Sequence, residues 1–109
     1  MRGFIGEFEE LVLLTIACLN TEAYGVAIKE DIEQRANRPI SIGSLHSTIT
    51  RLQEKGFLDS RLGEPSHERG GRRKRYFSLT NNGVIALNNI KNLRDDLWAE
   101  ARLNPAVDR

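Results

Sequence analysis

The amino-acid sequence predicts a mainly α-helical protein that carries one small β-hairpin and ends in a long helix. Three observations support this fold class. Apolar residues recur at helical intervals in three segments before residue 57 and in a fourth after residue 80. The segments 57–62 and 75–79 have the composition of short strands and flank a hydrophilic loop. A length of 109 residues suits one folding unit and is short for two.

The first helix is expected at about residues 7–19. Phe8, Val12 and Ile16 lie on one face at intervals of four, while Leu14 and Cys18 extend the apolar surface almost all the way round. Such a helix needs cover on more than one side. Cys18 is the only cysteine, and its apolar surroundings favour a small buried residue over a nucleophile, a ligand or half of a disulfide.

The second helix is expected at about residues 23–35, with Thr21 as a candidate N-cap. Tyr24, Ile28 and Ile32 fall at intervals of four and form its buried face. Pro39 disfavours helical geometry in the residue before it, so an extended link should follow the helix.

The third helix is expected at residues 41–55, with Ser41 as its N-cap and Leu45, Ile49 and Leu52 as its buried stripe. Small side chains on the opposite surface would let the helix approach another molecule closely. An ordinary solvent-exposed surface is the alternative, although such surfaces usually carry stronger helix formers than Ser and Thr. The predicted exposed face comprises Ser44, Ser47, Thr48, Arg51 and Lys55.

The hairpin loop at residues 63–74 concentrates positive charge. A flexible tip is expected at Gly70 and Gly71. Around them lie Arg69, Arg72, Arg73, Lys74 and Arg75.

The overall net charge of +1 conceals an uneven distribution along the chain. Residues 1–33 carry two basic and seven acidic residues, residues 34–80 carry ten and four, and residues 81–109 carry four of each. A basic field confined to one segment suits a defined docking face for a polyanion. On charge alone, an ordinary solvated surface is an equal alternative.

The last helix is expected at residues 81–103, capped by Thr80 and stopped by Asn104 and Pro105. A helix of about 22 residues is roughly 33 Å long, so its far half should extend beyond a core built from residues 1–80. An apolar seam on that half would be costly in a monomer, which favours pairing with a second copy of the chain. We therefore divide the chain into a unit at 1–80, a dimerisation helix at 81–103 and a tail at 104–109. The seam comprises Ala86, Ile90, Leu93, Leu97 and Ala101.

Three helices followed by a basic hairpin form the order of a winged helix-turn-helix. The chain resembles the PadR family of bacterial transcriptional regulators from Phe8 to about Leu103. Any one matching segment is weak evidence, but their common order and spacing are specific. The segments are AYGVAI at residues 23–28, SIGSL at 41–45, RLQEKGFL at 51–58 and GGRRKRYFSLT at 70–80, followed by Gly83.

The resemblance implies a homodimer, usually a repressor, in which the last helix packs on the partner's first helix. The lone cysteine and the lack of an export signal favour a cytoplasmic location. Some relatives bind planar hydrophobic compounds at the dimer centre, and Trp98 lies at about the corresponding position. Trp98 is therefore either a ligand contact or an ordinary part of the interface, and quenching of its fluorescence would distinguish the two. The expected interface comprises Phe8, Val12, Ile16, Ile90, Leu93, Leu97 and Trp98.

The same resemblance implies binding to double-stranded DNA at an inverted repeat, with the third helix in the major groove and the hairpin on the backbone or minor groove. Arg51 is suited to a bidentate contact with guanine, and the hairpin cations to phosphates. Tyr24 is either a phosphate contact or a core residue. Relatives commonly carry Tyr-Pro where this chain has His46 and Ser47, so His46 either donates to a phosphate or merely flanks the buried stripe. The expected DNA contacts are Tyr24, Ser44, His46, Ser47, Thr48, Arg51, Arg69, Arg72, Arg73, Lys74 and Arg75.

Other classes of function have little support in the sequence. His46 and His67 are the only histidines, and there is no phosphate-binding glycine loop or cluster with metal-ligand spacing, so we expect neither an enzyme nor a cofactor. The longest apolar run is too short to cross a bilayer, and no export signal precedes it. The remaining alternative is a winged helix that binds protein or RNA without operator specificity.

Overall fold

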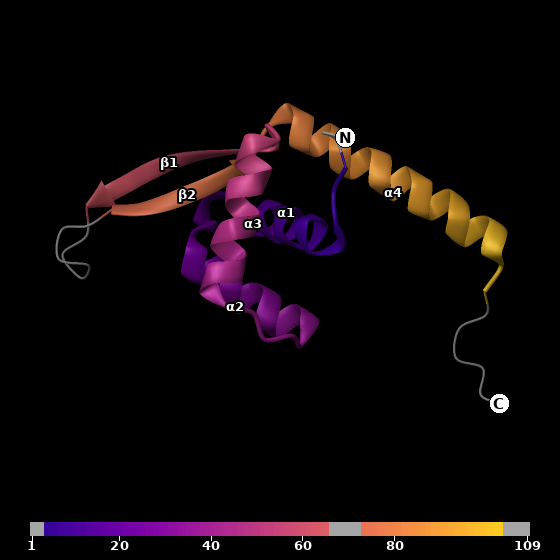
Figure 1. Ribbon diagram of the computed structural model, residues 1–109, viewed down its shortest axis with the longest axis horizontal. Helices are drawn as coiled ribbons and strands as arrows, with labels where there is room; N and C mark the ends of the chain where they lie inside the picture. The colour runs from indigo at the N-terminus through magenta and orange to yellow at the C-terminus, as the bar shows by residue number, and fades with distance from the viewer. Residues whose placement is uncertain (1–3, 66–72, 104–109) are drawn as a thin grey trace.

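The computed structural model describes residues 4–65 and 73–103 and confirms the predicted fold class. Three helices form the body of the molecule; the hairpin extends from one side and the last helix from the other (Figure 1). The elements are α1 (Glu7–Leu19), the 3₁₀ turn η1 (Asn20–Glu22), α2 (Gly25–Ala36), α3 (Ile42–Glu54), β1 (Leu58–Pro65), β2 (Arg73–Leu79) and α4 (Asn81–Ala101).

The core lies where α1, α2 and α3 meet. Each helix contributes aliphatic side chains from one face. Leu58 of β1 and Phe77 of β2 complete the core. Each fully buried side chain of this size stabilises the fold by about 1.5–3 kcal/mol relative to its exposed state. The helical core residues are Val12, Leu13, Ile16, Ile28, Ile32, Leu45, Ile49 and Leu52.

Two predictions for α1 are wrong. Val12 and Ile16 were expected at the dimer interface, but they are 0% and 1% exposed because α2 and α3 already cover that face. Cys18 was expected to be buried and is exposed, and Leu14 is 46% exposed. Phe8 is half-buried against the core of its own chain, and its expected role in dimerisation stays a prediction.

Capping residues fix where α3 and α4 begin. Ser41 Oγ accepts a hydrogen bond from the Ser44 N–H at 3.0 Å, and Thr80 Oγ1 accepts one from the Gly83 N–H at 3.0 Å, as predicted for both. Thr21, by contrast, lies within η1 and does not cap α2, whose N-cap residue is Tyr24. The intervening turn moves the start of α2 two residues beyond the predicted position.

The β1–β2 hairpin, called the wing below, is a two-stranded antiparallel sheet. Leu58 pairs with Leu79 at its base, and the register shifts between Leu62 and Pro65. The wing joins the helical body through the Phe77 N–H, which donates to the Ala23 carbonyl at 2.8 Å. The strands extend beyond the predicted limits at 62 and 75 because pairing continues past the irregularity.

Only the first half of α4 contributes side chains to the core. Ala86, Leu87 and Ile90 contact the core, whereas every residue from 91 to 101 is exposed. Leu97 and Trp98 are 57% and 64% exposed. The C-terminal part of α4 projects away from the body (Figure 1). No helix in residues 4–65 and 73–103 combines the length and apolar character that a membrane span requires.

Gly83 allows the close approach of α4 to the end of α3. A Cβ atom at this position would overlap the Phe57 carbonyl oxygen, so the backbone would have to move. We expect Gly83→Ala to destabilise the fold by about 1–3 kcal/mol. Gly43→Ala should instead stabilise it by up to about 1 kcal/mol, because the added methyl group meets no atom within 4 Å and alanine favours the helix.

Urea denaturation of both variants measures these free energies of unfolding. Equal effects of the two substitutions would contradict the proposed contact between α4 and the Phe57 carbonyl.

Candidate DNA interface

The exposed face of α3 borders an open cleft of about 510 Å³ between α3, the start of α2 and the wing. The wall formed by β2 carries three consecutive cations, and none of the described residues that line the cleft is acidic. A concave surface of this charge attracts an anion. The lining residues are Tyr24, Gly25, Val26, Ile42, His46, Ile49, Thr50, Gln53, Arg73, Lys74, Arg75 and Phe77.

Helical geometry accounts for which side chains of α3 reach this cleft. Ile49 and the core residues beside it point inward, so His46, Thr50 and Gln53 lie on the flank that faces the wing. Ser44 and Ser47 are exposed, as predicted. The sequence prediction missed Thr50 and Gln53, although their positions four and seven residues after His46 place them on one side of the helix.

The prediction for Thr48 is wrong. Its side chain is 1% exposed and cannot reach a base edge. Thr48 follows Leu45 by three residues and precedes Leu52 by four, so it belongs to the buried stripe. Its hydroxyl accepts a hydrogen bond from Arg51 at 3.2 Å.

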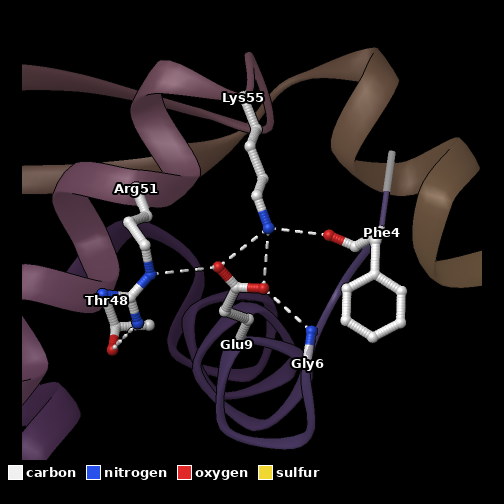
Figure 2. A network of polar contacts seen from close by, with 6 residues as sticks. All are labelled: Phe4, Gly6, Glu9, Thr48, Arg51 and Lys55. Atoms are coloured by element: carbon white, nitrogen blue, oxygen red, sulfur yellow. Dashed lines mark hydrogen bonds and ion pairs between the residues drawn. The ribbon is translucent and has the colours of Figure 1, made fainter. Parts of the chain in front are cut away.

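A buried carboxylate occupies the opposite flank of α3. Glu9 of α1 is 6% exposed, and Lys55 Nζ donates to its two carboxylate oxygens at 2.9 and 3.0 Å. The Gly6 N–H also donates to Glu9 Oε1 at 2.8 Å, and Lys55 reaches the Phe4 carbonyl at 2.7 Å. Figure 2 shows these groups converging from α1, α3 and the segment before α1.

Arg51 belongs to the same network and not to the wing-facing flank. Its Nε lies 3.5 Å from Glu9 Oε2, while its side chain stays 54% exposed (Figure 2). Lys55, predicted on an exposed face, is turned toward α1 by the same carboxylate. Both cations are therefore partly neutralised within the protein.

The network also controls the ionisation of Glu9. Burial by itself raises the pKa of this carboxyl group, but hydrogen bonds from Lys55, the Gly6 N–H and Arg51 outweigh burial and leave the pKa below its ordinary value. Glu9 is therefore charged in the folded protein at neutral pH.

The wing cations differ from those of α3. Arg73 is exposed, Lys74 Nζ lies 4.0 Å from the centre of the Tyr24 ring, and Arg75 donates to Ser60 Oγ at 3.1 Å. None of the three forms an ion pair with a carboxylate in the part of the chain that the structure describes. Arg69 and Arg72, also predicted to bind DNA, lie outside the described residues.

A second cleft of about 580 Å³ lies between α1 and α4. Leu14, Val84, Leu87 and Trp98 form its apolar wall. At its rim, Arg94 binds Glu10 at 3.0 Å and ties the middle of α4 to α1.

Comparisons with known proteins agree with this architecture. Residues 13–89 match the family described as transcriptional regulator PadR-like. A PadR-like regulator from Bacillus cereus has a similar structure, with a TM-score of 0.70 and 19% identity over 86% of each chain. A PadR family regulator from Eggerthella lenta gives 0.63 and 25% identity over 90% of this chain and 88% of its own. A search of curated protein sequences found no match.

The Glu9 network generates a prediction for stability. Glu9→Gln removes the charge that Lys55 and Arg51 share, so we expect the free energy of unfolding at neutral pH to fall by about 1–3 kcal/mol. Because folding lowers the pKa of Glu9, its contribution is present above the ordinary pKa of 4.5 and is lost as the pH falls through the folded-state value.

Urea denaturation from pH 3 to pH 7 tests this expectation. The difference between wild type and Glu9→Gln should be constant near neutrality and shrink in acid. Glu30→Gln, an exposed position on α2, serves as the control and should change stability little. A difference for Glu9→Gln that is independent of pH would contradict the assigned role.

Proposed function

The chain belongs to the PadR-like family of transcriptional regulators, and on that premise we propose that it is a cytoplasmic repressor that binds an inverted-repeat DNA operator as a homodimer. The observation that carries the proposal is the cleft between α3 and the wing. It combines the polar side chains of His46, Thr50 and Gln53 with a wall of cations and has no acidic residue among its described lining. Membership of a family of regulators assigns the chain a non-enzymatic role.

In this proposal, the exposed face of α3 enters the major groove. His46, Ser47 and Thr50 are placed to contact base edges and nearby phosphates, and Gln53 has the bidentate amide that matches adenine. Gln53 donates to Ser60 of the wing at 3.3 Å in the free protein and would exchange this contact for DNA. Ile42 is 44% exposed at the start of α3 and suits contact with a thymine methyl group.

The wing supplies affinity in the proposed complex. Arg73, Lys74 and Arg75 are suited to phosphates, which position the protein with little sequence information. Arg69 and Arg72 keep the same proposed role on the basis of sequence alone. Arg51 is held by Glu9 within the protein, so we assign base reading chiefly to the other residues of α3. Tyr24, at the start of α2, contacts Lys74 within the protein.

The second copy is proposed to cover α4. Leu93, Leu97 and Trp98 are exposed beyond the body of the molecule, and the cleft between α1 and α4 offers an apolar surface beside them. A twofold axis through this contact would place two α3 helices about one DNA turn, roughly 34 Å, apart. Leu14, exposed on α1, replaces Val12 and Ile16 as the proposed contribution of that helix.

An effector site is proposed in the same cleft. Trp98 is the only tryptophan and lines this cleft together with apolar side chains of α1 and α4, so a planar hydrophobic molecule could stack on it and alter the dimer. Its alternative role is packing within the dimer interface.

Two threonines of α3 test which face reads DNA. Thr50→Ala removes an exposed side chain of the cleft, so we expect binding to the preferred duplex to weaken roughly fivefold, or about 1 kcal/mol. Thr48→Val exchanges a buried hydroxyl group for a methyl group and removes its hydrogen bond from Arg51, which Glu9 still holds, so it should leave affinity unchanged. Fluorescence anisotropy measures both constants on a duplex selected from random sequences.

A larger loss for Thr48→Val than for Thr50→Ala would contradict the assigned face. In the same assay, RNA or single-stranded DNA that competes as well as the duplex would favour the alternative of an interaction module without operator specificity.

The homodimer generates its own prediction. Leu97→Glu places a charge on the exposed half of α4, so we expect dissociation to monomers in sedimentation velocity and weaker binding to the two-half-site duplex. Leu62→Glu introduces the same change at an exposed leucine of the wing and should remain dimeric. A wild-type protein that sediments as a monomer would overturn the proposed assembly.

A further inference from the structure

A continuous series of cations and aromatic rings joins the wing to the start of α2. Lys74 Nζ lies 4.0 Å from the centre of the Tyr24 ring. The Tyr24 and Tyr76 rings meet edge to face, with centres 5.6 Å apart and planes at 72°. Arg61 Cζ lies 4.7 Å from the centre of the Tyr76 ring. We call Arg61, Tyr76, Tyr24 and Lys74 the wing clamp.

Backbone contacts hold the two halves of the wing clamp in register. Tyr24 and Tyr76 form an isolated antiparallel bridge, beside the hydrogen bond from the Phe77 N–H to the Ala23 carbonyl. Gly63 of β1 leaves room for the Tyr76 ring, because a Cβ atom there would lie 2.6 Å from the ring carbon Cε1. The strands β1 and β2 and the start of α2 therefore meet at these rings.

The wing needs such support. A two-stranded hairpin alone is marginally stable in water and depends on packing against another element. Only its base reaches the core, through Leu58 and Phe77. The aromatic contacts extend the attachment outward along β2 to Lys74.

The wing clamp also holds its cations without neutralising them. Lys55 on α3 is bound to the Glu9 carboxylate, whereas Lys74 and Arg61 rest on aromatic faces. Within residues 4–65 and 73–103, neither forms an ion pair. An aromatic ring attracts a cation through its quadrupole and leaves the net positive charge in place. Lys74 lines the cleft beside α3, so that charge is available to an anion there.

We propose that Tyr24 is a positioning residue for DNA binding, whose ring fixes Lys74 and the wing at a set distance from α3. The inference rests on the proposed function and adds to it. The ring of Tyr24, and not its hydroxyl group, carries the role. A wing that is positioned before binding loses less conformational freedom when it meets the phosphate backbone.

The test measures affinity and its salt dependence for a duplex selected with the wild-type protein. Tyr24→Phe keeps the ring and should bind within about twofold of wild type. Tyr24→Leu should bind about threefold to tenfold more weakly, the scale of a lost cation–aromatic contact. The slope of log K against log salt should fall in magnitude by about one unit, as for Lys74→Gln, because one phosphate contact is lost in each.

Double substitutions show whether Tyr24 acts through Lys74. Tyr24→Leu combined with Lys74→Gln should be little weaker than Lys74→Gln alone, since both remove the same contact. The matched control combines Tyr24→Leu with Arg75→Gln, because the guanidinium group of Arg75 bonds to Ser60 and not to Tyr24. In this pair the fold-losses in affinity of the two single variants should multiply. Gly63→Ala is a second test of the wing clamp that leaves Tyr24 and Lys74 unsubstituted. The added methyl group displaces the Tyr76 ring, which supports the Tyr24 ring. This variant should reproduce the reduced salt slope even if Tyr24→Leu fails to fold.

Distinct results would overturn the inference. Tyr24→Phe as weak as Tyr24→Leu would assign the role to the hydroxyl group. Multiplying losses for Tyr24→Leu and Lys74→Gln, or an unchanged slope in Gly63→Ala, would separate the wing clamp from phosphate binding. A wild-type protein that binds no duplex would instead overturn the proposed function itself.

Discussion

The buried carboxylate of Glu9 constrains which face of α3 is available to another molecule. Hydrophobic packing of Leu45, Ile49 and Leu52 leaves a broad polar surface on this helix, and Glu9 then holds one flank of that surface against α1 through Lys55 and Arg51. The flank that remains is the one bordered by the wing. A single ionised group thus links the segment before α1, α1 itself and the end of α3 into one unit (Figure 2).

Ion pairing within the chain also accounts for the uneven distribution of charge along the sequence. The acidic first third provides partners for cations of the middle third, since Glu7 binds Arg38, Asp31 binds Arg35 and Glu9 binds both cations of α3. These pairs reduce the positive field around the helices. On the wing, Arg61 and Lys74 rest on aromatic rings and Arg75 bonds to a serine hydroxyl group, so the field is concentrated where the wing borders the cleft.

Local sequence signals were sufficient for the order of elements and for the caps at Ser41 and Thr80, because each depends on residues three or four positions apart. The exposed face of α3 could not be fixed in this way. Helical spacing alone placed Thr48 among the exposed residues and left out Thr50. The rotation of α3 about its own axis, which decides between them, is set by the packing of α3 on α1 and α2. Val12 and Ile16 illustrate the same limit, since their apolar character does not say whether their own chain or a second copy covers them. The ion pairs of Glu9 gave no local signal, because Arg51 and Lys55 follow it by more than 40 residues.

A structure of the protein bound to its selected duplex tests the central claim most directly. The account predicts two copies related by a twofold axis, with His46, Ser47 and Thr50 of each α3 against base edges in successive major grooves and Lys74 at a phosphate. It also predicts that the ion pairs of Glu9 with Lys55 and Arg51 persist in the complex. An α3 helix that lies away from the groove, or that enters it through Arg51 released from Glu9, would contradict the account.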